Sequence, residues 1–232
     1  MRYGMQVQEM NAVAILNLNN FMPQIARAAF QAAAQRWGAA YIEVTQSLGN
    51  FHPFWAKAHV PLSCHTRGFE RVLQLDADML VAPDCPSPFT YAPADKFGVV
   101  STVQPDRLVR HIRHFNIAKW ASHYRVKGYT RPREHLNAGL LLYHQGHHEA
   151  LLRRWQTHAE TGTRRPPCPM PEQFVLSCLL AENPAQRHWL PWQFNACRLP
   201  SGVVPHKAYI AHFHAPRRRP LGVIMRSFVW ER

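Results

Sequence analysis

The sequence predicts an α/β fold with a mostly parallel central sheet flanked by helices, and three observations support this prediction. Short apolar runs alternate along the chain with longer helical segments, which is the order of βαβ units. The first two runs, 12–18 and 41–45, enclose an alanine-rich helical segment at 25–37. A third run, 72–81, is rich in valine and leucine without helical periodicity, as in a strand that a parallel sheet buries on both faces.

The remaining elements follow in order. Gly38 is placed to end the first helix as its C′ residue. The two strands around that helix should be parallel, with a right-handed crossover between them. A proline at position 171 suits the first turn of a late helix. Further elements are expected in this order: a short helix at 54–59, strands at 96–101 and 136–143, and helices at 149–160 and 171–181.

The chain has the size and composition of one compact domain. It contains 232 residues, of which 47% are hydrophobic, so we expect a single domain over 1–232. No apolar run approaches the roughly 18 residues of a membrane span, and the first residues lack the apolar stretch of a signal peptide. Five cysteines without Cys-x-x-Cys spacing argue against a disulfide framework or a zinc ribbon. We therefore expect a cytoplasmic protein, and the sequence leaves its oligomeric state open.

Asp76 and Asp78 lie one residue apart at the carboxyl end of the third apolar run. In open α/β sheets, ligands bind at this edge. Side chains two residues apart on an extended segment point the same way, so both carboxylates should face one hard cation such as Mn²⁺ or Mg²⁺. Asp-x-Asp triplets also occur by chance as solvated turns, and this alternative stays open. Two charges beside a buried run are costly unless they bind something, which favours the metal site.

Five short motifs follow one another along the chain. They are Leu75-Asp76-Ala77-Asp78, Leu136-Asn137-Ala138-Gly139-Leu140-Leu141, Pro171-Glu172-Gln173, Trp192-Gln193-Phe194-Asn195 and Ile210-Ala211-His212-Phe213. With these motifs in this order, the chain resembles the nucleotide-sugar glycosyltransferases of GT-A fold. Within them it is most similar to family 8, which contains glycogenin and bacterial lipopolysaccharide galactosyltransferases. The resemblance implies a Rossmann-like sheet, a nucleotide-binding half at 1–81 and a sugar and acceptor half at 82–232.

The resemblance also implies a metal site and a donor. Asp76, Asp78 and His212 would hold Mn²⁺ or Mg²⁺, with His214 as an alternative to His212, and the donor would be a UDP-sugar used by a hexosyltransferase. The family has a phosphate-binding lysine after this histidine. Here Arg218 and Arg219 occupy that region, and a guanidinium can clamp a phosphate.

Further residues are assigned to the sugar and the base by the same resemblance. Asn137 and Gly139 would face the sugar, the glycine because the backbone passes close to the ligand. Glu172, which replaces the family's aspartate, would accept hydrogen bonds from sugar hydroxyls. Gln173 would lie near the anomeric carbon. Alternatively, an acidic residue at a helix start simply complements the helix dipole.

Two residues in the first half are also assigned by resemblance. Phe21 would stack on a uracil, and Lys57 matches a cationic position that precedes the metal motif. The family retains the anomeric configuration without a convincing protein nucleophile, so we assign no catalytic base.

The charge of the chain points to a polyanionic acceptor. Lysine and arginine number 27 against 14 acidic residues, a net charge of +13. Between 107 and 133 the chain has basic residues interleaved with aromatic ones and no acidic residue. From this segment we expect the acceptor to be bound by Arg110, Arg113, Trp120, Arg125, Lys127 and Arg131.

The acceptor class is open between two polyanions. A hydroxymethylated pyrimidine in DNA of bacteriophage type is slightly favoured, and such a base would leave the stack to react. Lipopolysaccharide or another envelope glycan is the alternative. Outside this enzyme class, the chain could be a non-catalytic, basic nucleic-acid-binding protein. A metal-dependent nuclease would need more carboxylates than 14 acidic residues readily supply.

Overall fold

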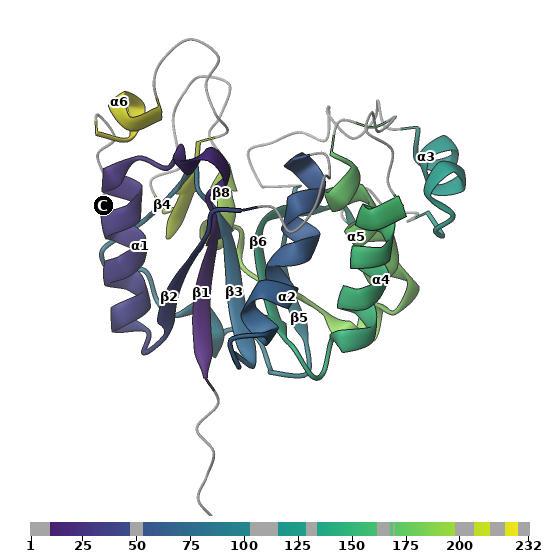
Figure 1. Cartoon of the computed structure of the whole chain (residues 1–232), viewed down its shortest axis with the longest axis horizontal. Helices are drawn as coiled ribbons and strands as arrows, with labels where there is room; N and C mark the ends of the chain where they lie inside the picture. Colours follow the sequence, from purple (N-terminus) through teal and green to yellow (C-terminus); the bar gives the residue numbers. More distant parts are fainter. Residues whose placement is uncertain are drawn as a thin grey trace, which may run out of the picture.

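The computed structural model describes residues 10–46, 53–102, 116–128, 134–161, 168, 170–197, 207–213 and 221–226. The predicted α/β class is confirmed: a central sheet is flanked by helices on both faces (Figure 1). The strands are β1 (Asn11–Leu16), β2 (Ala40–Val44), β3 (Arg71–Asp76), β4 (Met79–Val81), β5 (Phe97–Ser101), β6 (Leu136–His144), β7 (Arg187–Trp189), β8 (Ala196–Cys197) and β9 (Ile210–His212). The α-helices are α1 (Gln24–Arg36), α2 (Val60–His65), α3 (Ile117–Tyr124), α4 (Glu149–Thr161), α5 (Pro171–Glu182) and α6 (Leu221–Arg226).

Six strands form the central sheet in the order β2-β1-β3-β6-β5-β7. The pairs β1/β2, β1/β3 and β5/β7 are parallel, whereas β6 runs antiparallel to both of its neighbours. The βαβ unit predicted at the start of the chain is therefore present as β1, α1 and β2. A second sheet of three short strands, in the order β4-β9-β8, lies beside the first.

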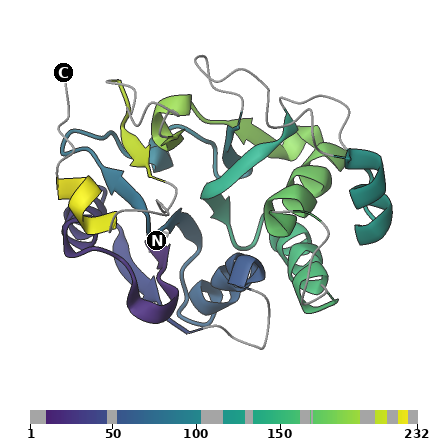
Figure 2. The same cartoon turned by 90° about the horizontal axis from the view of Figure 1, so that it is seen from above.

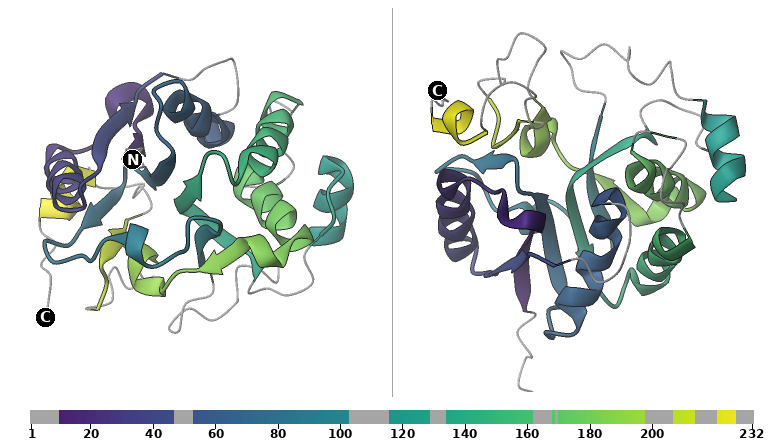
Figure 3. Two further views of the ribbon diagram at one scale, coloured as in Figure 1. Left: turned by 90° about the horizontal axis from the view of Figure 1, so that it is seen from below. Right: turned by 45° about the horizontal axis from the view of Figure 1, so that its top comes forward.

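Successive side chains along each strand point to opposite faces of the sheet, and this alternation divides the core into two clusters. Along β1, Ala12 and Ala14 belong to one cluster and Val13 and Ile15 to the other. The first cluster packs the sheet against α2, α3, α4 and α5, and the second packs it against α1, the small sheet and α6. Seen from above, α6 lies next to α1, and α3 lies at the far side of the molecule (Figures 2 and 3).

Several boundaries differ from the sequence predictions. The first strand ends at Leu16, and a 3₁₀ turn follows at Leu18–Asn20. The helix predicted near 54–59 is a 3₁₀ segment, Pro53–His59, that continues into α2. The apolar run 72–81 is two strands, because the chain turns after Asp76 and leaves the central sheet for the small one.

Helix α1 is anchored to the edge strand β2 by one carboxylate. Glu43 accepts hydrogen bonds from Arg27 Nε at 2.7 Å, from the Tyr41 hydroxyl at 2.6 Å and from Asn17 Nδ2 at 3.0 Å. The hydrogen bond from Arg27 is the main cause that lowers the pKa of Glu43 from 4.5 to about 2, although partial burial opposes it.

We therefore expect Glu43→Gln to lower the free energy of unfolding at neutral pH by about 2 kcal/mol. A depressed folded pKa contributes stability that is present above the unfolded pKa and is lost in acid. The difference between wild type and variant should accordingly shrink as the pH falls from 4.5 toward 2. Urea unfolding across this range measures it. The exposed Glu149, changed to Gln, is the control, and a pH-independent difference at position 43 would contradict the prediction.

Candidate metal centre

Two aspartates and one histidine meet where the two sheets adjoin. Asp76 is the last residue of β3, Asp78 lies in the turn that leads to β4, and His212 is the last residue of β9. Strand β9 pairs antiparallel with β4 so that His212 lies opposite Met79. The backbone N–H of Phe213 also donates to the carbonyl of Asp78 at 3.0 Å, which closes the pairing beside the turn. The small sheet thus brings a residue near the end of the chain to the Asp-x-Asp turn.

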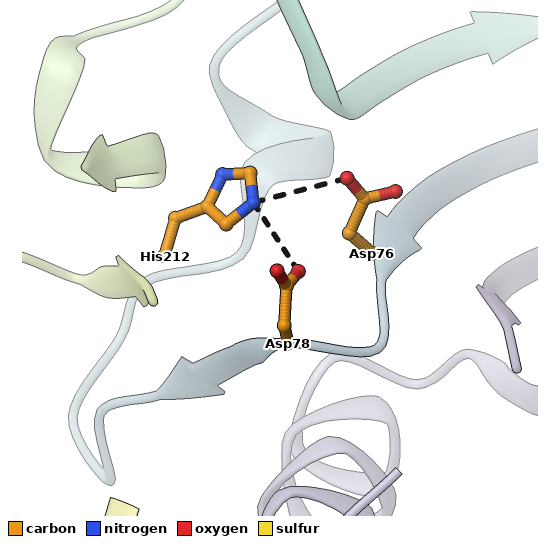
Figure 4. A group of neighbouring side chains, drawn as sticks. All are labelled: Asp76, Asp78 and His212. Carbon is orange, nitrogen blue, oxygen red and sulfur yellow. Dashed lines mark ion pairs between the residues drawn. The ribbon is translucent and has the colours of Figure 1, made fainter. Parts of the chain in front are cut away.

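The three side chains point toward one another (Figure 4). His212 Nε2 lies 3.2 Å from Asp78 Oδ1 and 3.8 Å from Asp76 Oδ2. One potential ligand atom from each residue lies within 4.8 Å of the others. Two carboxylate oxygens and one imidazole nitrogen suit Mn²⁺ or Mg²⁺, and three protein ligands leave coordination positions for the oxygens of a bound molecule. The residues predicted from the sequence therefore fit such an ion.

The two aspartates converge for a reason that differs from the one expected from the sequence. Asp76 and Asp78 do not lie on one extended strand, so the alternation of side chains along a strand is not what brings their carboxylates to the same side. The extended geometry ends at Asp76, and it is the turn at 77–78 that directs the second carboxylate to the same place. Burial by itself lowers the pKa of His212, but the Asp78 carboxylate raises it to about 10. In the absence of a metal, a proton on the imidazole offsets part of the negative charge of the two carboxylates, and the Lys57 ammonium lies 2.7 Å from Asp76 Oδ2.

Lys57 connects the aspartates to the next part of the site. Its Nζ donates to Asp76 Oδ2 at 2.7 Å and lies 4.0 Å from Glu172 Oε1. Burial opposes the charge of Lys57, while Asp76 and Glu172 act the other way and raise its pKa. Burial also raises the pKa of Glu172, to about 7, against the attraction of Lys57. The Glu172 side chain is 3% exposed, and no described group hydrogen-bonds its Oε2. A hydroxyl that reached Oε2 of Glu172 would find an acceptor.

Asn137 and Gly139 lie on β6 beside His212. The Asn137 side chain donates to Cys197 Sγ at 3.3 Å and accepts the Gly139 backbone N–H at 2.8 Å. A Cβ at Gly139 would lie 2.5 Å from His212 Cε1 and 2.8 Å from Met79 Cε. The close approach that requires glycine here is therefore to the imidazole of His212. From the sequence, the close approach was expected at a sugar.

Gly139→Ala should consequently displace His212 and weaken metal binding. Because the colliding atoms belong to a buried ring, we also expect a loss of about 1 to 3 kcal/mol in the free energy of unfolding. Isothermal titration with Mn²⁺ and urea unfolding measure the two effects. Gly146→Ala is the matched control, because its added Cβ would meet nothing closer than 3.6 Å. Wild-type Mn²⁺ affinity in Gly139→Ala would contradict the prediction.

Gln173 is held by a buried network that the sequence did not predict. Its Oε1 accepts the Ala138 N–H at 2.9 Å, so its amide nitrogen faces His135 Nε2 at 2.8 Å. His135 must then accept at Nε2 and carry its proton on Nδ1, which lies 3.4 Å from Ser177 Oγ. Burial lowers the pKa of His135 to about 4, which keeps the ring neutral. The role of Gln173 near an anomeric carbon stays a prediction.

The other residues assigned to the site from the sequence differ in their exposure, and some lie outside the described residues. Phe21 is 50% exposed just beyond the first strand, and its role in stacking stays a prediction. Arg125 and Lys127 are exposed after α3. Trp120 is a correction: it is only 9% exposed and packs edge-on against Phe174, because it lies on the inner face of α3. Outside the described residues lie His214, Arg218, Arg219, Arg110, Arg113 and Arg131.

Solved structures with a similar fold include several glycosyltransferases. The chain is similar to a glycosyltransferase involved in the glycosylation of the major capsid of PBCV-1 (TM-score 0.59, 12% identity, 92% of this chain and 99% of that one). It is also similar to mouse xyloside xylosyltransferase 1 (0.54, 12%, 88% and 98%) and to GlyE of Streptococcus pneumoniae TIGR4 (0.57, 15%, 96% and 62%). No protein-family model matches the chain, and no curated protein matches its sequence. The fold is GT-A-like.

Within the described ranges, every helix is too short or too polar to cross a bilayer.

Proposed function

We propose that the protein is a metal-dependent glycosyltransferase of family 8 type that transfers a hexosyl group from a UDP-sugar to a hydroxyl acceptor. One observation carries this proposal: Asp76, Asp78 and His212 converge at the carboxyl edge of the sheet in a GT-A-like fold. In such folds this edge is where a ligand binds. The single domain would divide into a nucleotide-binding half, 1–81, and a sugar and acceptor half, 82–232.

Different residues of the chain would bind the metal, stabilise the leaving group and bind the sugar. Mn²⁺ or Mg²⁺ held by the three ligands would neutralise charge on the leaving nucleoside diphosphate. Lys57 adds a fixed positive charge beside Asp76, in a position to steady the same developing charge. Glu172 offers a buried carboxylate to the hydroxyls of the sugar, and its extra methylene relative to aspartate would select among sugars. Phe21, Arg218 and Arg219 are proposed to contact the base and the phosphates.

The acceptor is proposed to be a polyanion, since the net charge is +13. Exposed Arg125 and Lys127 support this proposal, whereas the burial of Trp120 removes one stacking residue that favoured nucleic acid. Hydroxymethylated DNA remains the acceptor that we favour, and an anionic envelope glycan is the alternative. All five cysteines are buried thiols, which suits a reducing cytoplasm.

Thermal unfolding with a panel of nucleoside diphosphates tests the donor. With Mn²⁺ present, UDP should raise the unfolding midpoint, and EDTA should remove the rise, because a ligand that binds only the folded state stabilises it. UDP near 100 times its Kd would add about 2.7 kcal/mol. No shift with any nucleoside diphosphate would overturn the proposal and favour the non-catalytic nucleic-acid-binding protein.

The acceptor needs a separate experiment. Binding of duplex DNA that contains hydroxymethylated pyrimidine, measured across a salt series, should weaken steeply as salt rises. Labelled UDP-sugars would then reveal transfer to this duplex. No binding at low salt would exclude DNA, and the same assay with lipopolysaccharide micelles would test the envelope glycan.

A further inference from the structure

The ring of His212 has a partner on the side away from the aspartates. Its Nδ1 lies 2.9 Å from Asn195 Oδ1, while its Nε2 faces Asp78 and Asp76. An amide oxygen can only accept a hydrogen bond, so Nδ1 carries a proton. When a metal displaces the other ring proton, the lone pair that it needs is therefore at Nε2. We propose that Asn195 is a positioning residue, which directs Nε2 of His212 toward the metal.

Asn195 is itself fixed by its surroundings. It is fully buried at the end of the 3₁₀ segment Trp192–Asn195, directly before β8. Strand β8 pairs in parallel with β9, which places Cys197 opposite His212. The backbone N–H of Tyr209 donates to the Gln193 carbonyl at 2.8 Å and holds the same segment against β9. The amide oxygen therefore reaches the imidazole from a rigid support.

A second contact limits the ring in another direction. His212 packs so closely on β6 that a Cβ at Gly139 would lie 2.8 Å from Nδ1. Packing on Gly139 restricts rotation of the imidazole about its Cβ–Cγ bond, and the hydrogen bond to Asn195 selects the ring orientation in which Nδ1 faces the amide oxygen. With both restraints in place, Nε2 has one direction available, toward Asp76 and Asp78.

This arrangement predicts what the loss of Asn195 would do. A ligating histidine that donates its other N–H to an oxygen is held in the correct tautomer and orientation, and loss of that partner costs about 10- to 100-fold in metal affinity. The inference rests on the proposed metal site and extends it to a residue that binds no metal. It gives a role to the Trp-Asn motif, to which the sequence argument assigned none.

Mn²⁺ titration of three variants tests the inference, with free Mn²⁺ followed by electron paramagnetic resonance. Asn195→Leu should weaken Mn²⁺ binding by about 10- to 100-fold. Asn195→Asp keeps an oxygen acceptor in place and should keep at least the wild-type affinity. Gln145→Leu removes another buried carboxamide, at the far end of β6, and should bind Mn²⁺ as wild type does. Wild-type affinity in Asn195→Leu would overturn the inference.

A measurement on the wild-type chain covers the case in which Asn195→Leu does not fold. In protein with ¹⁵N-labelled histidine and bound ¹¹³Cd²⁺, the metal should show scalar coupling to Nε2 of His212, and Nδ1 should carry the proton. Coupling to Nδ1 would overturn the inference. Neither test uses a nucleotide, so UDP that fails to stabilise a Mn²⁺-binding protein overturns only the proposed function. A wild-type chain that binds no Mn²⁺ overturns both.

Discussion

Asp78→Asn should abolish the Mn²⁺-dependent stabilisation by UDP and reduce sugar transfer to the background rate. Asp78 is the carboxylate nearest to His212, and the amide that replaces it is neutral and a poorer ligand for a hard cation. Loss of a partner outside the ligand shell costs about 10- to 100-fold in affinity, so loss of a ligand should cost more than about 100-fold. Thermal unfolding with Mn²⁺ and UDP measures the binding, and release of UDP from labelled UDP-sugars measures turnover.

The same substitution at an exposed carboxylate provides the control. Asp95 is more than half exposed and pairs only with its neighbour Lys96 among the described ion pairs. Asp95→Asn should therefore keep the Mn²⁺-dependent shift of the midpoint. If Asp78→Asn kept it too, the cluster of Asp76, Asp78 and His212 would not be the metal site.

The Asp78 variant also separates the alternatives to a transferase. A basic nucleic-acid-binding protein whose Asp-x-Asp is accidental would keep its affinity for DNA in Asp78→Asn, or gain slightly from the lost negative charge. A two-metal nuclease needs more converging carboxylates. In the part of the chain that the structure describes, only one group of three such ligands is found, so a second metal would lack a comparable site.

The sequence predicted those parts of the molecule that depend on local pattern. Runs of apolar residues located β1, β2, β3, β5 and β6, and Gly38, with its φ of +64°, ends α1 as expected. Short elements were merged or missed: β4 was included in one run with β3, and β8 and β9 were not predicted. These strands have three, two and three residues, too few for a periodic signal. Yet these strands bring His212 to the aspartates. The order of motifs identified this histidine, and periodicity alone would not have done so.

The rest of the site depends on contacts between distant segments. The buried network of His135, Ser177 and Gln173 and the contact of Asn195 with His212 join residues that are 17 to 42 positions apart. A sequence without an alignment gives no signal for such pairs. For Trp120 the local pattern itself was misleading. A tryptophan among arginines in the sequence suggested a stacking surface, but its position on α3 directs the side chain into the core, against Phe174.

Lys57→Met should destabilise the metal-free protein more than any surface substitution would. The Lys57 side chain is 15% exposed, and its ammonium bridges Asp76 and Glu172. Removal of one partner from a largely buried ion pair leaves the other charge uncompensated, and we expect a loss of about 3 kcal/mol in the free energy of unfolding. Urea unfolding in EDTA measures this loss. Lys96→Met, at a lysine that pairs with the exposed Asp95, should change the free energy by less than about 0.5 kcal/mol.

Mn²⁺ should reverse part of the loss in Lys57→Met. In the wild-type protein the ammonium lies 2.7 Å from Asp76 Oδ2, so a cation that binds this carboxylate does so against the repulsion of Lys57. Without the ammonium, that repulsion is absent and the metal supplies the missing positive charge. The rise of the unfolding midpoint with Mn²⁺ should therefore be larger in Lys57→Met than in wild type, whereas sugar transfer should fall. An equal rise in both proteins would mean that Lys57 and the metal do not share Asp76.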